Sequence, residues 1–79
     1  MNALLRLPAV LSATGYSRAT LYARIKQQLM TPPVKLGVRC AAWPSEEIAA
    51  LNAARIAGKS DEQIRELVST LARRRAIFA

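Results

Sequence analysis

The spacing of apolar and polar residues predicts two short helices near the start of this 79-residue chain. Leu7, Val10 and Leu11 follow the i, i+3, i+4 spacing of one helical face. Gly15 is predicted to end this helix, because glycine readily adopts the left-handed conformation of a C-terminal cap. A second helix is expected to begin within a few residues.

The second predicted helix runs from Ser17, its N-cap, to about Gln28. Leu21, Ile25 and Leu29 form its apolar stripe. Two short helices joined by a three-residue turn that contains glycine are typical of a helix-turn-helix. The prolines that follow exclude further helix.

A small β-hairpin is predicted next, from two short runs on either side of Gly37. Val34–Leu36 forms the first run and Cys40–Trp43 the second. Trp43 is expected in the core, because a large aromatic side chain beneath a hairpin is more often a packing residue than a platform for bases.

Two more helices complete the pattern. Ser45 is predicted to be the N-cap of a third helix that Gly58 ends, and two glutamates occupy its electropositive first turn. Ser60 and Gln63 form the capping box of a fourth helix. Its apolar face is predicted either to pack on its own domain or to form an oligomer interface, and it consists of Ile64, Leu67, Val68 and Leu71. A third alternative, a helix that lies on a membrane surface, is disfavoured by the acidic first turn.

The charge distribution favours a polyanionic partner. The net charge is +7, and the acids all lie after residue 44. The first 44 residues therefore carry cations alone, namely Arg6, Arg18, Arg24, Lys26, Lys35 and Arg39. A purely solvating surface normally mixes both signs, so nucleic acid is the leading candidate and an anionic membrane surface the second.

The composition argues against an enzyme or a metal site. The chain has no histidine and a single cysteine, Cys40, so the usual general base and a zinc ligand set are both missing. We predict no catalytic residues, no metal and no cofactor. No segment reaches transmembrane length, and we predict no membrane partner. A single cysteine cannot form an internal disulfide, so a cytoplasmic location is expected.

A helical wheel separates the cations of the second helix. Ala19, Tyr22, Ala23 and Lys26 fall opposite the apolar stripe, where small alanines allow close approach to a groove. Ser17 and Arg18 occupy the helix start, where free N–H groups favour phosphate. Arg24 falls at the edge of the core face. The alternative is an ordinary solvated helix face, with Tyr22 partly buried.

These residues resemble the AlpA-like prophage regulators and the phage excisionases, small winged-helix relatives of the MerR DNA-binding domain. The resemblance covers about residues 4 to 57 and depends on an ordered combination of short motifs. They are Leu7–Leu11, Gly15–Tyr22, Pro33–Gly37 and Trp43-Pro44. The chain departs from the family at Tyr16, where an aliphatic residue is common, and in an extension after Gly58.

The resemblance implies a winged helix-turn-helix at residues 1–58 with a β-hairpin wing. Its recognition helix would enter the major groove of double-stranded DNA through Ser17, Arg18, Ala19, Thr20, Tyr22, Ala23, Arg24 and Lys26. Its wing would reach phosphates or the adjacent minor groove through Lys35 and Arg39. The C-terminal helix at 59–79 is predicted from its capping box and apolar face, so the whole fold is expected to be mainly α.

The family resemblance leaves two roles open, an excisionase (recombination directionality factor) that bends DNA for an integrase, and a transcriptional regulator of a mobile element. Self-association on DNA is expected, because one small module reads only a few base pairs. The rival interpretation is an adaptor or antitoxin-like module that binds protein or RNA through its fourth helix.

Overall fold

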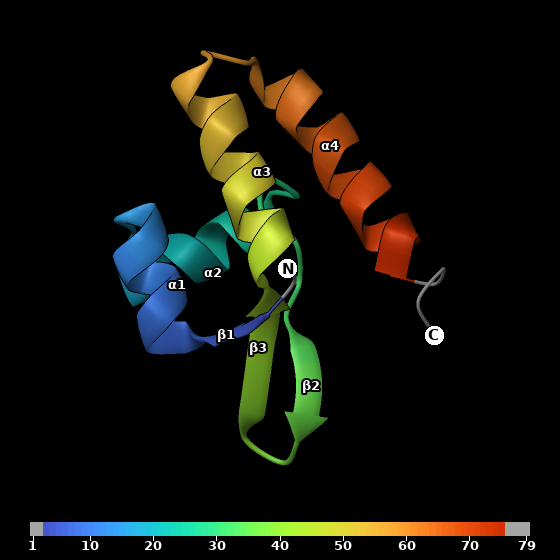
Figure 1. Ribbon diagram of the computed structural model, residues 1–79. Helices are drawn as coiled ribbons and strands as arrows, with labels where there is room; N and C mark the ends of the chain where they lie inside the picture. Colours follow the sequence, from blue (N-terminus) through green and yellow to red (C-terminus); the bar gives the residue numbers. More distant parts are fainter. Residues whose placement is uncertain (1–2, 76–79) are drawn as a thin grey trace.

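The protein is mostly helical, with a small antiparallel sheet at one end. The structure, a computed structural model, describes residues 3–75. Figure 1 shows α3 and α4 side by side, α1 and α2 at the other side of α3, and the β2–β3 hairpin extending away from the helices. The described elements are β1 (Leu4–Arg6), α1 (Leu7–Thr14), α2 (Arg18–Lys26), β2 (Val34–Gly37), β3 (Cys40–Pro44), α3 (Ser45–Ile56) and α4 (Asp61–Arg74).

The sheet has three strands, one more than the sequence predicted. Its order is β1-β3-β2, with both outer strands antiparallel to β3. The β2–β3 hairpin is confirmed. β1 was missed because three residues are too short for a visible alternation, and its partners, Ala42 to Pro44, lie far along the chain. Ala3 extends this contact, since its N–H donates to the Ser45 hydroxyl at 2.8 Å.

The turn between α1 and α2 has the structure that was predicted from Gly15 and Ser17. Gly15 has φ +75°, and its N–H donates to the Leu11 carbonyl at 2.9 Å. A Cβ atom at position 15 would have no other heavy atom within 4 Å, so there is room for a side chain. Glycine is favoured there because its backbone is left-handed. Ser17 is the N-cap of α2. The two helices are thereby joined by a short and well-defined turn.

The end of α2 differs from the sequence prediction. The helix ends at Lys26 rather than near Gln28, because Gln28 has φ +63° and turns the chain away from the helix axis. The Leu29 N–H then donates back to the Arg24 carbonyl at 2.8 Å. Leu29 is buried as expected, but it enters the core from the segment after the helix.

The start of α3 also differs by one position. Pro44, with φ −59° and ψ 131°, occupies the N-cap position that the sequence assigned to Ser45. The reason is that Pro44 is still paired with Leu4 in the sheet, so the strand passes into the helix without a loop. Glu46 and Glu47 do lie in the first turn, as predicted. The helix ends shortly before Gly58, whose φ is +76°.

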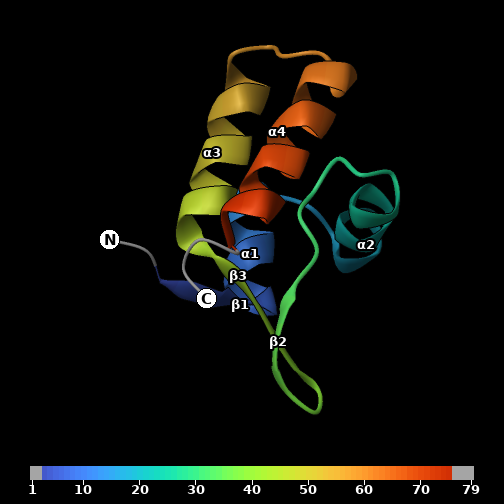
Figure 2. The ribbon, with the colours of Figure 1, turned by 90° about the vertical axis from the view of Figure 1, so that its right-hand side faces the viewer.

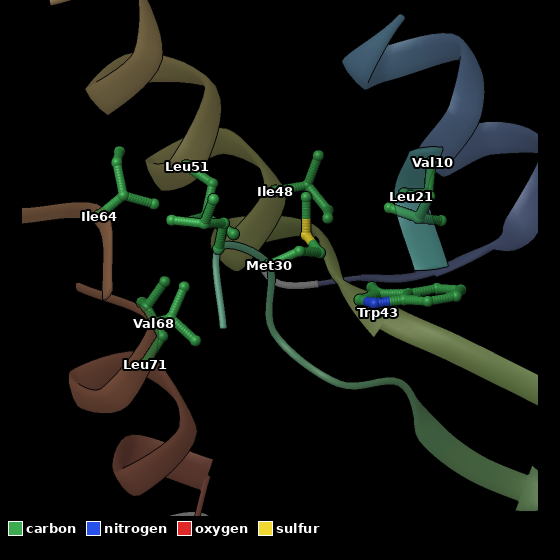
Figure 3. Packing of buried hydrophobic residues seen from close by; sticks show 10 residues of the cluster. Val10, Leu21, Met30, Trp43, Ile48, Leu51, Ile64, Val68 and Leu71 are labelled. Carbon is green, nitrogen blue, oxygen red and sulfur yellow. The ribbon is translucent and has the colours of Figure 1, made fainter. Parts of the chain in front are cut away.

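One hydrophobic core joins all four helices to the sheet (Figure 3). Trp43 is fully buried, as predicted, and lies against Val10 and Leu21. Its indole N–H donates to the Thr31 carbonyl at 2.9 Å. A buried polar group needs such a partner, because leaving it unpaired costs about 1–3 kcal/mol. Trp43 therefore links the sheet to the segment before β2.

The fourth helix packs on α3 through its predicted apolar face. The capping box of Ser60 and Gln63 is confirmed. The four residues predicted for an oligomer interface belong to the chain's own core, with Leu67 half-buried and the others buried: Ile64, Leu67, Val68 and Leu71. Oligomerisation through them stays a prediction and would require α4 to expose this face. Residues 76–79 of the predicted 59–79 segment lie outside the described residues.

Candidate nucleic-acid interface

The start of α2 is held by its serine cap. Ser17 Oγ accepts the Thr20 N–H at 3.2 Å and donates to Thr20 Oγ1 at 2.9 Å. The Thr20 hydroxyl is thus engaged in the cap, although it was a candidate for DNA contact. The first turn of α2 contains no acid, so its N–H groups and the adjacent Arg18 side chain present positive charge together.

The outward face of α2 agrees with the helical wheel. Ser17 is exposed at its N-terminal end, and Tyr22 is 41% exposed. Leu21 is fully buried on the opposite side. The exposed candidates on α2 itself are Arg18, Ala19, Tyr22, Ala23 and Lys26. These residues form a surface with small residues between longer polar and charged ones.

Arg24 has a different environment from the other cations of α2. Its guanidinium lies 5.8 Å from the centre of the Tyr16 ring, within the range of a cation–π contact. It also donates to the Gln27 side chain at 3.3 Å, and its Nε is buried without a hydrogen-bond partner among the described residues. Arg24 therefore lies against the Tyr16 ring at the edge of the core.

The hairpin carries the other two cationic candidates. Lys35 lies in β2 and Arg39 in the turn between the strands, and both are exposed. Arg39 has φ +61°, a left-handed conformation that is uncommon for residues other than glycine. The register of the hairpin shifts between Lys35 and Gly37. The charged tip thus has an irregular backbone.

The helix and the hairpin border the same open hollow, of about 1070 Å³. α2 contributes Arg18 and Tyr22, and the hairpin contributes residues 35–41. Figure 2 shows the chain running from α2 to β2, with α2 to one side of the hairpin. Among the described residues, the lining has three cations, Arg18, Lys35 and Arg39, and no carboxylate. The structure thus brings predicted residues of both elements to one surface, while Lys26 lies on α2 outside the lining.

The sequence did not single out the apolar tip of the hairpin. Val38 is 95% exposed in the turn, and Leu36 is 48% exposed in β2. Both line the hollow between the cationic residues. The signal available in the sequence was Val38, an aliphatic residue that follows Gly37 in the predicted turn. Cys40, predicted as a small residue in a strand, is half-buried in β3 and also lines the hollow.

No metal cluster is present in the described part of the chain, residues 3–75, where no three His, Cys, Asp or Glu side chains gather as ligands. Within the same range, no helix combines the length and the apolar composition needed to cross a bilayer. The chemistry that this surface offers is charge, hydrogen bonding and apolar contact.

The fold and this cationic surface are consistent with a small DNA-binding regulator of the helix-turn-helix kind. The chain belongs to the prophage CP4-57 regulatory protein (AlpA) family, whose sequence profile matches residues 3–55. This is a family of phage regulatory proteins. The matched residues extend from β1 into α3, so α4 lies outside them.

One relative comes from a phage. The chain is 42% identical over 55 residues to an uncharacterized protein, ORF88, of Enterobacteria phage P4. The match covers 70% of this chain and 62% of that protein, so the chain spans less than two thirds of its relative's length. No solved structure matches the chain.

Proposed function

We propose that this protein binds double-stranded DNA in a sequence-specific manner as a winged helix-turn-helix. The observation that carries the proposal is the hollow that α2 and the hairpin share, whose lining contains Arg18, Lys35 and Arg39 and no acid from residues 3–75. α2 is the recognition helix and enters the major groove. The β2–β3 hairpin is the wing and contacts phosphates or the adjacent minor groove.

The side chains of α2 suit this role. Ala19 and Ala23 let the helix approach the groove closely, while Tyr22 and Lys26 are long enough to reach base edges or phosphates. The capped start of α2 offers a phosphate its N–H groups and Arg18. A DNA phosphate backbone that passes through the hollow would meet cations on both sides. These contacts would fix the position of the protein along the DNA.

The biological role is regulation of a mobile element, either as a transcriptional regulator or as an excisionase that shapes DNA for an integrase. The family name supports regulation. The excisionase role rests on the resemblance in the helix-turn-helix motifs. We further propose residues 1–58 as the DNA-binding domain, self-association on DNA, and a cytoplasmic location. An integrase is the protein partner expected for excision.

A gel-shift titration tests the proposal. The parent protein is expected to retain duplex DNA more strongly than structured RNA of equal length. Lys26→Ala should change affinity or site preference, and Arg39→Ala should weaken binding to all sequences. Lys59→Ala removes the same charge from the exposed loop between α3 and α4 and serves as the matched control.

Two results would contradict the proposal. If Lys26→Ala and Arg39→Ala bind duplex DNA like the parent at low and at moderate salt, the assigned surface is wrong. Stronger retention of RNA would favour the adaptor or antitoxin-like alternative. That alternative uses α4, whose apolar face is occupied by the chain's own core.

A further inference from the structure

The segment that connects α2 to β2 determines where the hairpin lies relative to the recognition helix. We call residues 27–33 the helix–hairpin linker. It has no regular secondary structure, yet Leu29, Met30 and Thr31 are at most 3% exposed. A buried irregular segment needs partners for its backbone polar groups. Its carbonyl groups therefore show what holds it in place.

Three linker carbonyls accept hydrogen bonds from side chains of distant elements. The central bond comes from the sheet, and the two outer bonds come from arginines of α4 and its C-cap. The pairs are Arg65 Nε to Gln27 O at 3.1 Å, Trp43 Nε1 to Thr31 O at 2.9 Å, and Arg75 Nη2 to Pro32 O at 2.7 Å. The fourth helix thus holds the linker near both of its ends.

Each arginine is suited to its partner. Gln27 is the C-cap of α2, where a carbonyl lacks a helical partner and a cation is favoured by the helix dipole. Arg75 is oriented by Glu47 of α3, which it contacts through both Nε and Nη2. The planar guanidinium can make this two-pronged contact and still donate to Pro32.

We infer that α4 is a positioning element that fixes the hairpin relative to α2, with Arg65 and Arg75 as its positioning residues. The inference rests on the proposed function, because a helix and a wing that read DNA together must keep a constant offset. Binding is stronger when this offset exists before DNA arrives, since less ordering is then required. α4 lies outside the residues that the family model matches, which end within α3.

The first test compares Arg65→Met with Arg73→Met. Both remove one exposed arginine of α4 and keep an apolar stem, but only Arg65 contacts the linker. The probes are a duplex selected by the parent from a random pool and a scrambled duplex of equal length. Arg65→Met should lose about threefold to tenfold in affinity for the selected duplex, the effect of one ordinary hydrogen bond, because the bond to Gln27 is exposed to water. For the scrambled duplex, the affinity of Arg65→Met should fall by no more than the affinity of Arg73→Met.

Amide hydrogen exchange provides a readout in the protein without DNA. Exchange of the amides of residues 27–31 should become faster in Arg65→Met and stay at the parental rate in Arg73→Met. Arg75→Lys is the second variant, because lysine keeps the charge beside Glu47 but lacks the planar fork. It should also speed exchange in the linker and reduce preference for the selected duplex.

The outcomes separate this inference from the proposed function. If the parent selects no duplex, the proposed function is wrong and the inference falls with it. If the parent selects a duplex, but Arg65→Met and Arg75→Lys keep its affinity and the parental exchange rates, the positioning role alone is overturned. Equal losses for the selected and the scrambled duplex would also overturn it, because they indicate a simple charge effect.

Discussion

Arg75 and Glu47 form a two-pronged ion pair between the end of α4 and the first turn of α3. Arg75 Nη2 lies 2.6 Å from Glu47 Oε1, and Arg75 Nε lies 2.8 Å from Glu47 Oε2. The Glu47 side chain is only 7% exposed. Because water cannot replace the arginine at this site, the carboxylate depends on the pair.

Glu47→Gln is expected to reduce the free energy of unfolding by about 2–3 kcal/mol, less than the cost of about 3–5 kcal/mol for a fully buried pair, because Arg75 is partly exposed. Urea denaturation followed by circular dichroism would measure this. Glu66→Gln removes an exposed carboxylate of α4 and should change stability by less than about 0.5 kcal/mol. Similar values for the two variants would show that the pair contributes little.

The two serine caps offer a matched comparison. Ser17 caps α2 and Ser60 caps α4, each accepting the N–H of the residue three positions later at 3.2 Å. Ser17→Ala and Ser60→Ala should each destabilise the protein by about 1 kcal/mol in thermal unfolding. Only Ser17→Ala should also weaken duplex binding, measured well below both melting temperatures. Equal DNA affinity of the two variants would argue against a phosphate at the start of α2.

Replacing Arg39, which has a left-handed backbone conformation in the hairpin turn, is expected to have opposite effects on stability and on DNA binding. Arg39→Gly should stabilise the protein by about 0.5–1 kcal/mol, because glycine adopts φ near +61° without a steric cost. It should weaken binding to duplexes of any sequence, because a wing cation is lost. Gln28→Gly, at φ +63°, is the control for the backbone effect. A variant Arg39→Gly that binds DNA like Gln28→Gly would exclude Arg39 from the interface.

Salt dependence measures the contribution of Lys26. The slope of log affinity against log salt should fall in magnitude by about 0.9 in Lys26→Ala if Lys26 neutralises one phosphate. A purely base-directed contact would lower affinity with little change in slope. Fluorescence anisotropy between low and moderate salt separates these results, with Lys59→Ala as the reference. An affinity and a slope equal to those of Lys59→Ala would contradict a role for Lys26.

Much of the local structure could be predicted because its causes lie within a few residues. Gly15 and Ser17 define the turn before α2, and Ser60 with Gln63 starts α4. The burial of Leu21 and Trp43 follows from their spacing and size. Errors occurred where a distant contact decided a boundary. Pro44 stays in the sheet through Leu4, and Gln28 leaves the helix so that Leu29 can enter the core.

The sequence predicted the individual residues of the candidate site, but not the surface that they form together. The sequence selected the cations of α2 and of the hairpin separately, from charge and helical periodicity. Only the folded chain shows that Arg18, Lys35 and Arg39 border one hollow. It also shows Val38 exposed at the tip and Arg24 directed toward Tyr16. The DNA contacts of all these residues remain predictions.

The sequence by itself determined the helices, the caps at Gly15, Ser17 and Ser60, the hairpin and the concentration of positive charge in the first half of the chain. These features depend on backbone preferences and on neighbours within one or two turns. The tertiary structure decided the third strand, the hollow and the two arginines that hold the helix–hairpin linker. Arg65 and Arg75 donate to backbone carbonyls of residues far along the chain. Every residue has such a carbonyl, so no sequence pattern identifies which one will be the partner.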